Sequence, residues 1–142
     1  MDMQTADLAL PMLGMMVLTL LVWVYMFVQR VGFAQSNKLD IEQFKTPADV
    51  QILVPADISG ASNNFRNLFE LPVIFYAVCL YLMASGQVDS FYANCAWAFL
   101  LLRCLHSLIH CSYNRVAHRF GVYILSALVL WVMVVRAFMA AL

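Results

Sequence analysis

Long apolar runs dominate the sequence and restrict the chain to a membrane-embedded helical fold. The run from Leu8 to Val28 contains no charged side chain, and three further apolar runs follow it. A helix needs about 20 predominantly apolar residues to cross the hydrocarbon core of a bilayer. Only 11% of the residues are charged, against about 25% in soluble domains. We therefore predict an all-α integral membrane protein, a four-helix bundle in one domain (1–142), with spans at about 8–28, 65–83, 91–111 and 120–142.

Basic residues in the connections predict how these spans are oriented. Arg30, Lys38 and Lys45 lie in the long polar connection 29–64, and Arg115 and Arg119 link the last two spans. Connections rich in Lys and Arg usually stay on the cytoplasmic side. We expect both termini to lie outside and the polar loops in the cytoplasm, in a bacterial inner membrane. The net charge is zero and no basic patch is present, so nothing points to nucleic-acid binding.

Polar side chains enter the second apolar run at its start, over residues 63–72. A charged side chain at the centre of a membrane helix costs ~2.5–3.5 kcal/mol on insertion scales, so such groups face a bundle interior or a wet cavity. In a continuous helix Arg66 and Glu70 are four residues apart, and Asn67 and Glu70 are three apart. That spacing places all three on one flank.

The third span carries a second polar stripe. Arg103, His106 and His110 follow spacings of three and four, so they share one helix face. Glu70 is the only carboxylate within the predicted spans. Arg103 is the partner we expect for it, because an unpaired buried charge is strongly disfavoured. Such a pair would either lock two helices or subunits in register or belong to a binding site, and the residues alone leave both open.

A further polar group lies nearer the cytoplasmic ends of the spans. Several guanidiniums with amides and a phenol suit an anionic ligand that carries more than one carboxylate. Attraction to lipid phosphate is the alternative for Arg115 and Arg119. His106 and His110 lack a third metal ligand at matching spacing, so we predict interior histidines rather than a metal site. The group comprises Arg66, Asn67, His110, Asn114, Arg115, Arg119 and Tyr123.

Both polar stretches resemble those of the MAPEG superfamily, the membrane-associated proteins in eicosanoid and glutathione metabolism. Arg66-Asn67-Leu68-Phe69-Glu70-Leu71-Pro72 looks like the family's Arg-Asn-x-x-Glu segment with a proline soon after. Arg103-x-x-His106-Ser107-x-x-His110, followed by Arg115-x-x-x-Arg119-x-x-x-Tyr123, is similar to the prostaglandin E synthase branch. The length, the four spans and the long first loop match as well, and the chain looks like a bacterial member.

The resemblance implies a homotrimer with glutathione bound between subunits near the cytoplasmic side. Carried over by position, Arg119 would stabilise the thiolate of glutathione. A guanidinium can do so because a free thiol, with a pKa near 8.5, is mostly protonated at neutral pH. A lipophilic electrophile or hydroperoxide would arrive from the surrounding lipid. The positions that would contact glutathione are Arg66, Asn67, Glu70, Arg103, His106, His110 and Tyr123.

Two positions depart from the glutathione-using pattern. His110 stands where such members commonly have tyrosine, and Asn63 stands where some have an arginine one turn before Asn67. The charge of a histidine varies with pH. Two functions therefore compete: a glutathione-dependent transferase or peroxidase, favoured by Arg66, Arg119 and Tyr123, and a non-enzymatic lipid-binding or scaffold protein, favoured by the two departures.

Overall fold

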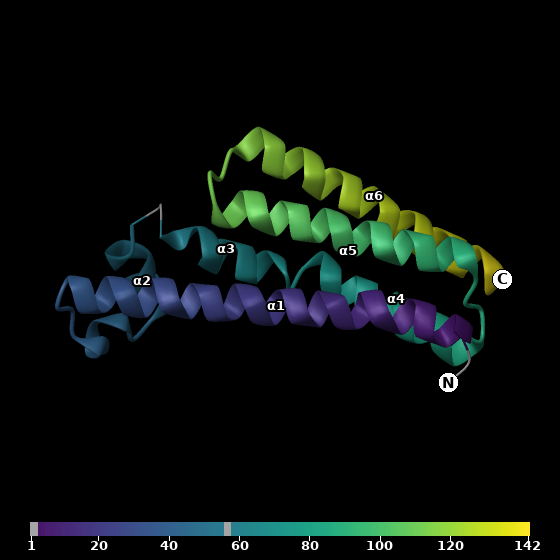
Figure 1. The fold of residues 1–142 in the computed structure, drawn as a ribbon, viewed down its shortest axis with the longest axis horizontal. Coiled ribbons are helices and arrows are strands. Elements are labelled where there is room, and N and C mark those ends of the chain that lie inside the picture. Colours follow the sequence, from purple (N-terminus) through teal and green to yellow (C-terminus); the bar gives the residue numbers. More distant parts are fainter. Residues whose placement is uncertain (1–2, 56–57) are drawn as a thin grey trace.

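The computed structural model describes residues 3–55 and 58–142, and these form a bundle of long helices (Figure 1). Among them, four stretches are long and apolar enough to cross a membrane: 6–36, 59–85, 90–111 and 116–140. The predicted all-α class with four membrane-spanning helices is confirmed. In chain order the elements are α1 (Met3–Ser36), the 3₁₀ helix η1 (Ile41–Phe44), α2 (Pro47–Leu53), α3 (Ser59–Asn67), α4 (Leu71–Ser85), α5 (Ser90–Cys111) and α6 (Val116–Ala140).

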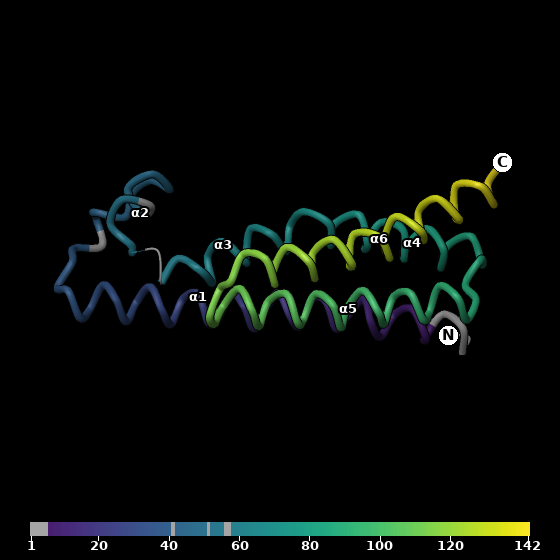
Figure 2. Tube along the Cα trace, turned by 90° about the horizontal axis from the view of Figure 1, so that it is seen from above, coloured from purple at the N-terminus to yellow at the C-terminus, as the bar shows by residue number. Residues whose placement is uncertain are grey.

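The four helical columns form a ring. α1 packs against α3, α4 and α5, while α6 packs against α5 and α4. The start of α1 and the C-terminus lie at the same end of the bundle as the α4–α5 link. The α5–α6 link and residues 37–55 lie toward the other end (Figures 1 and 2). The ends and connections are therefore grouped as the basic residues predicted, while their sidedness in the membrane stays a prediction.

The core side of α1 is a narrow stripe. Leu8, Met15 and Val22 of α1 are seven residues apart and all buried, which is the spacing of a single helix face. Between α4 and α5, the rings of Phe75 and Phe99 stack with centroids 4.5 Å apart. Twelve large apolar side chains of α1 are exposed, as expected of a helix that contacts lipid or another subunit.

The second span is not one helix but two. α3 ends at Asn67 and α4 begins at Leu71, so the predicted continuous span 65–83 is interrupted. Pro72 lies in the first turn of α4, where it has no N–H to donate and its ring would clash with the carbonyl of residue 68 in a continuous helix. α1 also differs from the prediction, because it continues beyond Val28 to Ser36.

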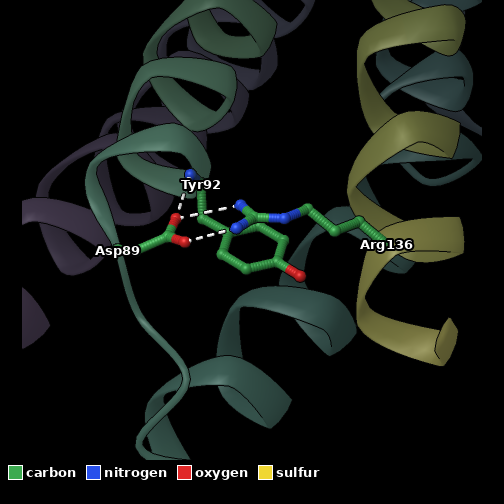
Figure 3. A network of polar contacts seen from close by, with 3 residues as sticks. All are labelled: Asp89, Tyr92 and Arg136. Atoms are coloured by element: carbon green, nitrogen blue, oxygen red, sulfur yellow. Dashed lines mark hydrogen bonds and ion pairs between the residues drawn. The ribbon is translucent and has the colours of Figure 1, made fainter. Parts of the chain in front are cut away.

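An ion pair at the end near the termini joins α6 to the start of α5 (Figure 3). Arg136 donates to both carboxylate oxygens of Asp89, at 3.1 and 2.6 Å. The Asp89 carboxylate also accepts from the backbone N–H of Tyr92 at 3.0 Å and so caps α5. The guanidinium lies over the rings of Phe91 and Tyr92, 4.5 and 4.4 Å from their centroids. These contacts hold the C-terminal part of α6 against α5.

Replacing Asp89 with asparagine tests this pair without removing the cap, because asparagine also caps helices well. We expect a loss of about 0.2–1 kcal/mol at neutral pH, the usual value of a partly exposed ion pair. The hydrogen bond from Arg136 lowers the pKa of Asp89, so this stability is present above the unfolded-state pKa and lost as the pH falls through the folded-state pKa. Thermal unfolding in detergent at several pH values should show the two proteins converging in acid; a constant difference would contradict the assignment.

Candidate functional site

A cluster of polar side chains lies inside the bundle toward the end opposite the termini, between α3, α5 and α6. α5 supplies most of it because the spacing of its polar residues keeps them on one face. Five of these side chains are buried: Asn64, Arg103, His106, Ser107 and His110. With three neighbours that contact them, they form what we call the polar cluster: Asn64, Asn67, Arg103, His106, Ser107, His110, Arg119 and Tyr123.

Arg103 is the deepest charge of the cluster, with 0% of its surface exposed. Its Nη2 donates to the backbone carbonyl of Asn67 at 3.2 Å, and its Cζ lies 5.6 Å from the ring centroid of Tyr123. Its Nε and Nη1 are buried and have no hydrogen-bond partner among the described residues. Because a buried charge is costly unless paired, this guanidinium favours an anion that comes from outside the single chain.

Arg119 joins the start of α6 to the end of α5. Its Nη1 donates to Nε2 of His110 at 2.9 Å and to Oδ1 of Asn114 at 2.8 Å. A guanidinium can only donate, so Nε2 of His110 must accept and the proton of the neutral ring lies on Nδ1. Asn114 can turn the chain here because it adopts a left-handed conformation, φ 47°, which asparagine tolerates. His110 and Asn114 thus fix the position of Arg119.

His106 completes the link between α5 and α6. Its Nδ1 lies 3.2 Å from the backbone carbonyl of Arg119, to which it must donate, so Nε2 is the unprotonated nitrogen of the neutral ring. Nε2 of His106 and Nδ1 of His110 are both buried without a partner in the described part of the chain. Oδ1 of Asn67 is in the same state. The cluster therefore offers two acceptors and one donor beside the guanidinium of Arg103.

Asn64 is a cluster residue that the sequence prediction did not single out. Its Oδ1 accepts from Ser107 at 3.4 Å, and its Nδ2 donates to Sγ of Cys111 at 3.5 Å. The spacing of Ala61, Asn64 and Leu68, which are all buried, would have identified it as inward-facing. Asn63 is exposed.

α3 can carry Asn64 this close to α5 because Gly60 has no side chain. A Cβ at this position would lie 2.8 Å from the backbone carbonyl oxygen of His110. We expect Gly60→Ala to lower the unfolding free energy by about 1–3 kcal/mol, as overpacking does, and to displace His110. Gly121→Ala is the matched control: it has open space and should be stabilising by roughly 0.5–1 kcal/mol, since alanine favours helix. Equal thermal stabilities of the two variants would contradict this close approach.

Two predicted site residues are exposed and are not hydrogen-bonded or ion-paired to the cluster. Arg66 and Glu70 are both exposed, and the ion pairs among the described residues are Lys45–Glu42 and Arg136–Asp89. The predicted interior pair of Glu70 with Arg103 is therefore wrong for the single chain. The physical reason is the break at 68–70, which ends the helical spacing that would have placed Arg66, Asn67 and Glu70 on one flank.

The remaining predicted residues are brought together. Arg103, His106, His110, Arg119 and Tyr123 meet where α5 and α6 approach each other, and Asn67 reaches them through its carbonyl. The rings of His106 and His110 are 5.5 Å apart. Among the described residues, no group of three His, Cys, Asp or Glu is placed to hold a metal ion.

Four apolar membrane-spanning helices around a buried, basic polar cluster define a multi-pass membrane protein. A sequence model of the MAPEG family matches residues 8–139, almost the full length of the chain. The chain belongs to the MAPEG family, which confirms the resemblance at this level; the branch within it stays a prediction. Comparison with curated proteins and with solved structures found no match.

Proposed function

We propose that the protein is a membrane-embedded, glutathione-dependent transferase or peroxidase that acts on lipophilic electrophiles. The observation that carries this proposal is the buried guanidinium of Arg103, which has no carboxylate partner among the described residues. Glutathione offers two carboxylates and further polar groups. The buried nitrogens of His106 and His110 and the amide oxygen of Asn67 can pair with such groups, while a purely apolar lipid would leave them unsatisfied.

In this proposal each cluster residue has a distinct task. Arg103 binds a carboxylate of the tripeptide, and His106, His110 and Asn67 orient it. Arg119 stabilises the thiolate. Its hydrogen bonds to His110 and Asn114 use only Nη1, so the other N–H groups of the guanidinium can donate to the sulfur. Glutathione supplies the nucleophilic sulfur. In a transferase reaction the sulfur forms a bond to the electrophilic carbon and displaces its leaving group. In a peroxidase reaction the sulfur attacks the terminal oxygen of the hydroperoxide, the O–O bond breaks and an alcohol leaves, and a second glutathione then converts the sulfenic acid to glutathione disulfide and water.

The proposed assembly is a homotrimer in the membrane. Arg66 and Glu70 are exposed on the single chain, so they can join a site only from a surface that meets a neighbouring subunit. Their exposure at this end of the bundle supports a site between subunits. We also propose the predicted sidedness, with the polar loops cytoplasmic and the termini outside an inner membrane.

The proposal is tested by measuring the binding of glutathione to the purified protein in detergent, with calorimetry and with thermal unfolding. Glutathione and its S-methyl analogue should both bind, because the carboxylates carry most of the recognition. Only glutathione should develop thiolate absorbance in the ultraviolet. If neither binds at millimolar concentration, the proposal fails and the non-enzymatic lipid-binding function takes its place.

A further inference from the structure

A cavity separate from the polar cluster lies where the C-terminal part of α1 meets η1 and α2. Its volume is about 480 Å³, within the ~300–1,000 Å³ usual for small-molecule sites. α2 lies toward this end of α1 (Figures 1 and 2). The walls are largely apolar and include Phe27, Val31, Leu39, Phe44 and Val50, and two basic residues, Arg30 and Lys38, also line the cavity.

The cavity lies at the boundary of the hydrocarbon region. α1 has 34 residues, and at 1.5 Å per residue it is ~51 Å long, well beyond the ~30 Å of a hydrocarbon core. The uncharged part of α1 begins at Leu8 and ends at Gln29, which matches that thickness. The lining residues of α1 start at Phe27 and continue to Lys38, so the cavity extends from the edge of the hydrocarbon into the head-group region.

Lys38, which lines the cavity, has a backbone conformation that glycine would adopt with less strain. The end of α1 is closed by hydrogen bonds from Lys38 N–H to the carbonyl of Gln35, at 3.2 Å, and from Leu39 N–H to that of Ala34, at 3.0 Å. This pairing is the Schellman motif, whose left-handed residue is usually glycine. Here that residue is Lys38, with φ 52°. A lysine in this conformation is strained, yet this one lines the cavity.

The charges at the cavity are of one sign. Arg30 donates to Oγ of Ser62 at 2.7 Å, and its Nε is buried without a partner among the described residues. None of the described residues that line the cavity is acidic, and the nearby Glu42 is instead paired with Lys45 at 3.1 Å. Two cations above an apolar wall are complementary to a molecule with an anionic head and an apolar tail.

We propose that this cavity binds an amphiphile with a single acyl chain and an anionic head group. The acyl chain lies against Phe27, Val31 and Phe44, and the carboxylate or phosphate of the head is held by Lys38 and Arg30. A free fatty acid and a lysophospholipid share this chemistry. The site is separate from the polar cluster, and it stands whether or not glutathione binds there.

The ligand class is tested with the full-length protein in non-ionic detergent, by native mass spectrometry and thermal unfolding. The probes are palmitate and palmitoyl-lysophosphatidylglycerol, with hexadecanol and palmitoyl-lysophosphatidylcholine as controls without net negative charge. We expect saturable binding of at least one anionic probe, and which of the two binds identifies the source as a fatty acid or a lipid. Binding of the controls with equal affinity, or no binding of either anionic probe, overturns the proposal.

Paired variants test the position of the site. Lys38→Gly removes the ammonium group and relieves the strain, so it should preserve or raise thermal stability and weaken anionic binding roughly tenfold, the loss expected for one charge-assisted hydrogen bond. Arg115→Gly, which removes an exposed cation outside the cavity lining, is its control. Val50→Trp should fill the cavity and abolish binding, whereas Ile52→Trp, on the same helix but 82% exposed, should not. Unchanged affinity in both Lys38→Gly and Val50→Trp contradicts the site.

Discussion

Replacing Arg103 with methionine is expected to make the ligand-free protein more stable and to weaken its affinity for glutathione. Methionine fills much of the same space without a charge, and replacing buried ionic groups by apolar ones is often stabilising by about 1–4 kcal/mol. The lost charge-assisted contact is worth about 1.5–3 kcal/mol, a weakening of roughly 10–150-fold. Denaturation in detergent and calorimetry with glutathione measure the two effects separately.

Arg115→Met is the matched control for this variant, because it removes the same charge from an exposed position outside the proposed site. Its stability should change by less than about 0.5 kcal/mol, as for most surface substitutions. If Arg103→Met instead destabilises the protein by several kcal/mol, a carboxylate of another subunit pairs with Arg103. The guanidinium would then be structural, and the main support for glutathione binding would be lost.

Replacing Arg119 with alanine should lower the rate of glutathione conjugation far more than it lowers binding. If Arg119 stabilises the developing thiolate, its removal should cost about 10²–10³ in rate, the range for loss of one preorganised donor. The thiolate absorbance of bound glutathione should fall in parallel. The rate of conjugation is measured with an aryl halide whose absorbance changes when glutathione is attached, and the affinity is measured by calorimetry.

Arg115 provides the control for Arg119, since it lies at the same end of α6 but is exposed. Arg115→Ala should leave both rate and thiolate absorbance close to those of the unaltered protein. Arg119→Lys keeps the charge but loses the planar fork that reaches His110 and Asn114, so an intermediate rate is expected. Full thiolate absorbance in Arg119→Ala would remove Arg119 from the proposed role.

Much of the fold follows from the sequence because a bilayer admits few solutions. Apolar length alone predicts the four spans, and the basic connections predict how the chain ends are grouped. The break at residues 68–70 was harder to foresee, since Pro72 alone could be absorbed as a kink. The extension of α1 to Ser36 could not be predicted either, because the polar residues after Val28 are equally compatible with a loop.

The site was predicted in part. The spacing of Arg103, His106 and His110 identified the inward face of α5, since a regular helix has one inward stripe. Glu70 was misplaced because its position was counted through a helix that does not continue. Contacts between helices, such as that of Arg119 with His110, depend on how α6 docks on α5, which spacing along one helix does not determine.

The break between α3 and α4 also bears on how Arg103 carries its charge. Its acceptor, the carbonyl of Asn67, lies at the C-terminus of α3, where aligned peptide dipoles amount to about half a negative charge. A carboxylate would neutralise the guanidinium fully and compete with an incoming anion. A helix end offsets only part of the charge, so the interior keeps a net positive potential at this depth. The C-terminus of α3 thus partly stabilises the buried charge of Arg103 and leaves the guanidinium able to attract an anionic ligand.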